Sequence, residues 1–136
     1  MNELYVWPAL VTAIALLVYL VLTINVGRAR FKYKVEPPNT TGDPGFERAF
    51  RVHQNTNEQL FPFLAALWLF SIYLSPTWGA IVGGIWILGR IAFAWGYYQA
   101  TEKRMLGFAI NSLSLMVLLL GSLIGIGLVL FDIRIA

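Results

Sequence analysis

The sequence predicts an all-α protein, an integral membrane bundle of four helices with a left-handed twist. Three observations lead to this fold class: 58% of the 136 residues are hydrophobic, only 12% are charged, and long uncharged runs alternate with short polar segments. Soluble proteins typically carry roughly 25% charged residues. The length fits one domain. We therefore expect residues 1–136 to form a single four-helix unit, with helices at about 4–27, 47–75, 78–102 and 105–131.

The first helix follows from the longest uncharged run near the N-terminus. Between Glu3 and Arg28 lie 24 uncharged residues, which is more than the ~20 that cross the hydrocarbon of a bilayer. The run has no basic start and no small-residue cleavage site, so we expect a membrane helix rather than a signal peptide. The polar segment that follows contains adjacent prolines and a Gly-Asp-Pro-Gly sequence, and both favour a loop.

The second and third helices share one uncharged run of 31 residues, from Gln59 to Gly89. This run is too long for one ordinary span and too short for two, and Ser75-Pro76-Thr77 marks the break within it. Only about 16 apolar residues precede the break, fewer than a span needs. Helix two must therefore take its remaining length from the polar residues upstream.

The fourth helix fills the 27 uncharged residues between Arg104 and Asp132. Its Gly121 and Gly125 have the spacing of close contacts between membrane helices. The same spacing also arises by chance in a glycine-rich span, so both interpretations stay open.

The distribution of basic residues predicts the orientation in the membrane. Most of the Arg and Lys residues lie in the first connection and the start of helix two, Lys103 and Arg104 lie in the third connection, and only Arg134 lies on the opposite side. The first and third connections are therefore expected to be cytoplasmic, in a bacterial inner membrane or an organelle membrane. Because the clustering reflects topology, we expect no nucleic acid partner.

A polar stripe on helix two is the first candidate for a functional site. Steps of three and four residues separate Arg48, Arg51, Asn55, Glu58 and Pro62. This spacing places them on one face of a helix. Charge at membrane depth is costly and normally faces a bundle interior, a cavity or a ligand, so the stripe indicates a binding site.

A second stripe lies on helix three. Arg90 and Tyr97 are seven residues apart, and Arg104 is seven further on, which gives one face if the helix continues that far. Helices two and three run antiparallel, so the start of one meets the end of the other. We therefore expect the two stripes to surround one pocket near the cytoplasmic interface.

The side chains of these stripes suit a small zwitterionic peptide. Guanidinium groups bind carboxylates, Glu58 can hold an ammonium, and Asn55 can pair with a peptide amide. A structural alternative stays open, in which Arg48, Arg51 and Glu58 form an ion-pair network between helices. Arg90 is the strongest candidate for a structural role, paired with Glu58 or Glu47.

Metal and cysteine chemistry are not expected. The chain has no cysteine and one histidine, His53. Thiolate metal sites and a cysteine nucleophile are thereby excluded, and no convincing metal ligand set remains. Any thiol chemistry must come from a substrate.

The run PPNTTGDPGFERAFRVHQNTNE, followed on helix three by Gly-Arg and Gly-Tyr-Tyr, resembles the MAPEG family, the membrane-associated proteins in eicosanoid and glutathione metabolism. Its core, residues 51–58, is similar to the signature of the branch that holds microsomal glutathione transferases and leukotriene C synthase. The resemblance implies a homotrimer that binds glutathione as cosubstrate between neighbouring subunits, with no tightly bound cofactor.

The resemblance also implies roles for individual residues. Arg104 would be the catalytic residue, because it would face the glutathione sulfur. The remaining glutathione-binding residues, matched by position, would be Arg30, Arg51, His53 in place of a common glutamine, Asn55, Glu58, Gln59, Phe93 and Tyr97. Gln59 and Phe93 stand where leukotriene C synthase has tyrosines, and Phe31 replaces a basic residue. These departures favour a broader transferase or peroxidase over leukotriene synthesis.

The function that the resemblance implies is conjugation of the glutathione thiolate to apolar electrophiles, with reduction of lipid hydroperoxides as a second activity. Such substrates would arrive from the lipid bilayer. One alternative is a non-catalytic lipid-binding or activating membrane protein of the same fold. Another is a structural or transporter-like membrane protein, which predicts that the arginines pair internally and leave no anion-sized cavity.

Overall fold

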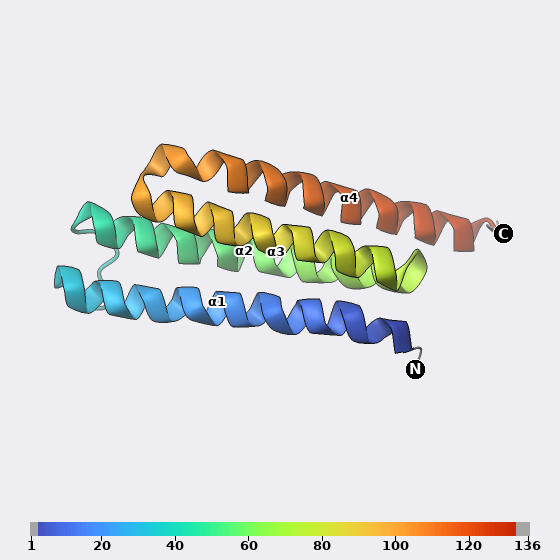
Figure 1. The fold of residues 1–136 in the computed structure, drawn as a ribbon, viewed down its shortest axis with the longest axis horizontal. Helices are drawn as coiled ribbons and strands as arrows, with labels where there is room; N and C mark the ends of the chain where they lie inside the picture. The colour runs from blue at the N-terminus through green and yellow to red at the C-terminus, as the bar shows by residue number, and fades with distance from the viewer. Residues whose placement is uncertain (1–2, 133–136) are drawn as a thin grey trace.

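The computed structural model describes residues 3–132 as four antiparallel helices (Figure 1). The all-α four-helix prediction is confirmed, and this part of the chain contains no strand. The helices are α1 (Val6–Tyr33), α2 (Pro44–Tyr73), α3 (Pro76–Gln99) and α4 (Met105–Leu130), with short 3-10 turns at Glu3–Tyr5 and Thr101–Arg104. The connections α1–α2 and α3–α4 lie at one end of the bundle, which we call the connection end, and the α2–α3 turn lies at the other. Arg134, which contributed to the predicted orientation, lies outside the described residues.

Three of the four helices are long and apolar enough to cross a membrane by length and composition. They are α1, α3 and α4, the first and last together with their preceding 3-10 turns. Helix α2 has 30 residues, and its first half carries the polar stripe. Since α2 continues unbroken from the polar stripe into its apolar half, the prediction that helix two extends upstream is confirmed. It packs against each of the other three helices.

The first connection is shorter than predicted. Helix α1 ends at Tyr33 rather than at residue 27, because Arg and Lys are good helix formers and continue the helix beyond its apolar run. Lys34 ends it in the left-handed conformation, with φ 57°. Helix α2 begins at Pro44 rather than at residue 47. Asp43 caps it by accepting a hydrogen bond from the Gly45 amide at 2.8 Å.

The predicted break between the second and third helices is confirmed. The Ser75 hydroxyl accepts a hydrogen bond from the Trp78 amide at 3.2 Å and caps α3, with Pro76 at its start. Helix α3 ends at Gln99 rather than at residue 102, because Ala100 is extended with φ −162°. The chain then folds back through a 3-10 turn into α4.

Glycines allow α4 to approach its neighbours closely. A Cβ at Gly107 would overlap the backbone of Phe93 in α3, so only glycine permits this crossing. A Cβ at Gly125 would stand 2.6 Å from the Tyr73 carbonyl oxygen, and one at Gly121 would overlap the ring of Phe70. The glycine pair of α4 therefore makes a close helix contact, the first of its two interpretations.

Candidate functional site

A polar cavity lies at the connection end, between α2, α3 and the start of α4. It has a volume of about 340 Å³. The two predicted stripes meet here, because the start of α2 lies beside the end of α3 as antiparallel packing requires. We call it the stripe cavity, and its lining residues are Arg51, Gln54, Asn55, Glu58, Phe93, Tyr97, Arg104 and Phe108.

The charges in the stripe cavity are not paired with each other. Arg51 and Glu58 are exposed, two turns apart on α2. Within residues 3–132, no Arg or Lys nitrogen lies within 4.0 Å of a carboxylate oxygen. The ion-pair network that remained an alternative is therefore absent from the described part of the chain. Cations and an anion are both available to a ligand.

Arg104 lines the cavity from a different structural element than the spacing indicated. The third helix does not continue to residue 104, which was the condition for a shared face with Tyr97, because Arg104 lies on the 3-10 turn Thr101–Arg104. Its Nη1 donates a hydrogen bond to the Thr101 carbonyl oxygen at 2.6 Å, and its guanidinium carbon lies 5.7 Å from the centre of the Tyr97 ring. Tyr97 in turn packs edge-on against Phe93 at 5.5 Å. The turn and this ring hold the guanidinium at the cavity without a carboxylate.

Arg90 is buried behind the cavity in a network that joins three helices. Its side chain is 1% exposed. Its Nε and Nη2 donate to Asn111 Oδ1 at 3.0 and 2.8 Å, and its Nη1 donates to Asn55 Oδ1 at 2.7 Å and to Thr56 Oγ1 at 3.0 Å. Asn111 Nδ2 donates to the Trp86 carbonyl oxygen at 2.6 Å. Arg90 therefore connects α2, α3 and α4, and it holds Asn55, one residue of the cavity wall.

The predicted partners of Arg90 are wrong. Neither Glu58 nor Glu47 approaches it; amide and hydroxyl oxygens take its hydrogen bonds, and the guanidinium carbon lies 4.4 Å from the centre of the Phe93 ring. Neutral partners satisfy the guanidinium donors without the further cost of burying a carboxylate.

Arg30 does not reach the stripe cavity within one chain. Its Nη1 donates to the carbonyl oxygens of Asn39 at 2.8 Å and Val35 at 3.4 Å, and its guanidinium lies 4.9 Å from the ring centre of Phe46. Arg30 thus binds the connection between α1 and α2 to the end of α1 through these hydrogen bonds. It also lines a separate cavity of about 630 Å³, together with the exposed Phe31.

Other candidate residues on α2 also lie outside the stripe cavity. His53 faces α1, where its Nε2 lies 3.0 Å from Thr23 Oγ1 and its ring stacks on Tyr19 at 5.0 Å. Gln59 is half-buried and does not line the cavity. Arg48 Nε donates to the Tyr98 carbonyl oxygen at 3.4 Å. Arg48 lines an adjoining cavity of about 300 Å³, which shares Arg51 and Tyr97 with the stripe cavity.

Sequence reasoning missed three residues of this region. Gln54 lies three residues after Arg51, so the periodicity that defined the stripe also points to it. Asn111 is the one amide side chain in an apolar span, and an isolated polar group at that depth indicates a buried partner. Phe108 carries no such signal, because apolar residues surround it in the sequence.

Comparison with known proteins identifies the family to which the chain belongs. Residues 8–124 match the MAPEG family. An uncharacterised protein of Synechocystis is 63% identical over 120 residues, which cover 88% of each chain. Human microsomal glutathione S-transferase 2 is 43% identical over 102 residues, covering 75% of this chain and 67% of that protein. Leukotriene C4 synthase of Cavia porcellus is 32% identical over 118 residues, covering 87% and 79%. The chain is a membrane protein and belongs to the MAPEG family.

Proposed function

We propose that the protein is a membrane-bound glutathione transferase, which conjugates the glutathione thiolate to apolar electrophiles. The names of its relatives support this, since one is a microsomal glutathione S-transferase and another a leukotriene C4 synthase. The single observation that carries the proposal is the stripe cavity, in which Arg51, Glu58 and Arg104 converge without neutralising one another.

Glutathione matches the cavity group by group. It has carboxylates at both ends, an ammonium, peptide amides and a thiol. Arg51 can bind a carboxylate through a forked pair of hydrogen bonds, Glu58 can accept from the ammonium, and Asn55 can donate to a peptide carbonyl. The cavity volume of about 340 Å³ is adequate for a small ligand.

Arg104 is the residue that we assign to the sulfur. A free thiol has a pKa near ~8.5, and only its thiolate is a strong nucleophile. A guanidinium beside the sulfur stabilises the anion and lowers the pKa of the bound thiol, so the thiol proton leaves to solvent at neutral pH. The thiolate then forms a carbon–sulfur bond with the electrophile, and a leaving group such as chloride departs with the electron pair.

Apolar substrates would enter from the bilayer. Phe108, on the wall of the stripe cavity, is 44% exposed, and the surface of α4 beyond it is apolar. A lipid hydroperoxide would be a second substrate class. The thiolate would attack the terminal oxygen of the hydroperoxide and release the alcohol, and a second glutathione would then displace that oxygen from sulfur as water and form the disulfide.

A homotrimer with glutathione between subunits would complete the site. Arg30 lies outside the stripe cavity of its own chain, so it can contact glutathione there only from a neighbouring copy. The same would hold for His53 and Gln59, which also lie outside the stripe cavity of their own chain. The excess of basic residues at the connection end supports a cytoplasmic orientation for this end.

The proposal is tested by conjugation of glutathione to a chlorinated nitrobenzene, with the purified, detergent-solubilised protein. We expect turnover above the buffer blank and a rise in the melting temperature with glutathione. S-methylglutathione is the matched control, because it should bind and stabilise without reacting. Stabilisation without turnover of this electrophile or of a lipid hydroperoxide would favour the non-catalytic alternative. Absence of both turnover and stabilisation would exclude glutathione use.

A further inference from the structure

A second cationic cavity lies at the connection end, between the end of α1, the start of α2 and the end of α3. Its volume is about 520 Å³. Three of its lining residues are cations and none is a carboxylate, in contrast to the stripe cavity with its Glu58. We call it the α1 groove, and it is lined by Asn25, Arg28, Ala29, Lys32, Tyr33, Gly45, Arg48, Ala49 and Tyr98.

Among the residues that the structure describes, the cations of the α1 groove have no acidic partner. Arg28 and Lys32 are exposed and one helical turn apart, so their charges repel each other. Within residues 3–132 neither has a carboxylate oxygen within 4.0 Å. The Lys32 ammonium lies 5.2 Å from the ring centre of Tyr33, and the Arg48 Nε donates to the Tyr98 carbonyl oxygen at 3.4 Å. An anion in the groove would relieve this repulsion.

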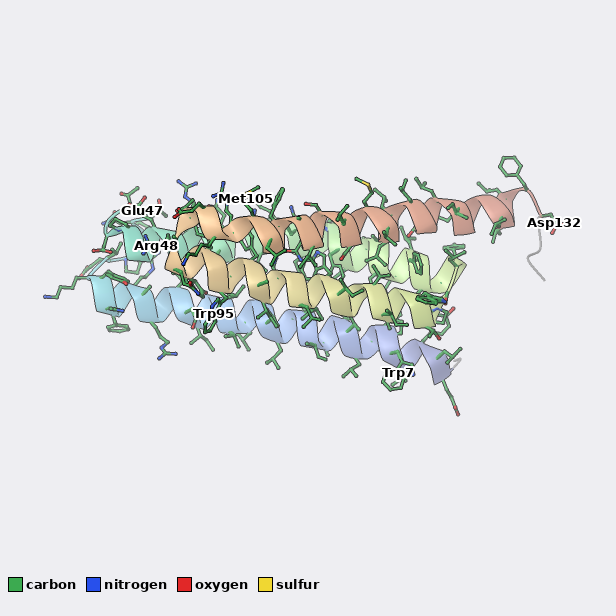
Figure 2. All side chains as sticks on the ribbon, turned by 45° about the horizontal axis from the view of Figure 1, so that its top comes forward. Trp7, Glu47, Arg48, Trp95, Met105 and Asp132 are labelled. Atoms are coloured by element: carbon green, nitrogen blue, oxygen red, sulfur yellow. The ribbon has the colours of Figure 1, made fainter. Side chains whose placement is uncertain are left out.

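Apolar surface lies one helical turn from the groove on α1 and α3. Asn25 lines the groove, and its Nδ2 donates to the Tyr98 hydroxyl at 3.1 Å. One turn further into the bilayer, Val21 on α1 is 48% exposed and Trp95 on α3 is 71% exposed. Figure 2 shows Trp95 and Arg48 toward the same end of the bundle. Exposed tryptophans favour the level of the lipid headgroups, so the groove lies where a headgroup meets its acyl chains.

We propose that the α1 groove binds the headgroup of an anionic phospholipid. Its phosphate oxygens would accept hydrogen bonds from the Arg28 and Arg48 guanidinium groups and from the Lys32 ammonium. Basic pockets between membrane helices on the cytoplasmic side have the charge and depth that such headgroups require. A free phosphate would use the cations alone, whereas a lipid also covers Val21 and Trp95. The site is separate from the stripe cavity and does not depend on glutathione binding.

The test measures the melting temperature of the full chain, by tryptophan fluorescence, in detergent micelles that contain added phospholipid. Phosphatidylglycerol should raise the melting temperature, and phosphatidylcholine at the same mole fraction should not. The double variant Arg28→Gln, Lys32→Gln should bind phosphatidylglycerol roughly 30-fold more weakly, since each cation contributes about fivefold. The matched control, Lys34→Gln with Lys103→Gln, removes the same charge outside the groove and should keep the full response.

Several outcomes would overturn the proposal. Equal shifts with both lipids would do so, as would equal losses in the double variant and its control. A full shift with inorganic phosphate alone would assign the groove to a free anion. If the double variant does not fold, quenching of tryptophan fluorescence by brominated phosphatidylglycerol provides a second test on the wild-type protein. This lipid should quench fluorescence more than brominated phosphatidylcholine does, and Trp95→Phe should remove the difference; failure of either result refutes the site.

Discussion

Substitution of Arg90 by leucine tests how far the buried network stabilises the bundle. The substitution leaves the Oδ1 atoms of Asn111 and Asn55 without their donor, while Thr56 keeps its hydrogen bond to the Val52 carbonyl oxygen at 2.8 Å. Each orphaned buried acceptor costs about 1–3 kcal/mol. The two acceptors together should therefore lower the free energy of unfolding by about 2–6 kcal/mol. The loss should fall toward the lower end of this range, because Asn55 is half-buried and water can reach it.

The assay is a double-mutant cycle in detergent, with unfolding followed for Arg90→Leu, Asn111→Leu and the combined variant. Because Asn111 accepts from two nitrogens of Arg90, the combined variant should lose less stability than the sum of the single losses, by at least about 1 kcal/mol. Lys34→Leu, at an exposed position, controls for loss of a cation and should cost little. Strictly additive losses would show that the two residues are not coupled and would refute the network.

Three further predictions concern catalysis and packing. Arg104→Ala should lower kcat by roughly one to two orders of magnitude and change glutathione affinity less than about threefold. It should also shift the pH of half-maximal activity upward, toward the free thiol pKa near ~8.5. Equal losses in rate and affinity would make Arg104 a binding residue. Glu58→Gln should raise KM for glutathione with kcat nearly unchanged, and an unchanged KM would contradict ammonium binding. Gly107→Val should abolish folded protein or lower its melting temperature sharply, since its Cβ meets the Phe93 backbone, whereas Gly127→Val, with open space around it, should not.

The positions of the helices followed from the sequence, but their ends did not. The break at Ser75-Pro76 carries its own local signal, a cap followed by a proline, and the structure has it in place. The uncharged run ends at Gly27, six residues before the end of α1, because the first charged residue does not end the helix. Charge limits how deep a residue lies in the membrane but not how far a helix continues, so α1 extends to Tyr33.

Helical periodicity predicted which residues line the stripe cavity, but it could not predict the hydrogen-bond partners of Arg90, which is buried behind the cavity. Arg51, Asn55 and Glu58 meet Tyr97 there because spacing along a helix fixes the face of each residue. The partner of Arg90 depends instead on how α4 packs, and α4 offers a neutral amide rather than a carboxylate. The place of Arg30 likewise depends on contacts beyond one helix.

The hydrogen bond between Arg90 and Asn55 fixes which end of the Asn55 amide the stripe cavity can use. A guanidinium only donates, so the Asn55 oxygen must face Arg90, and it is occupied at 2.7 Å. The amide nitrogen, which only donates, has both of its hydrogens available to an occupant of the cavity, whereas the oxygen has one acceptor site left. At this point of the wall the protein therefore favours a molecule that presents a carbonyl over one that presents an N–H.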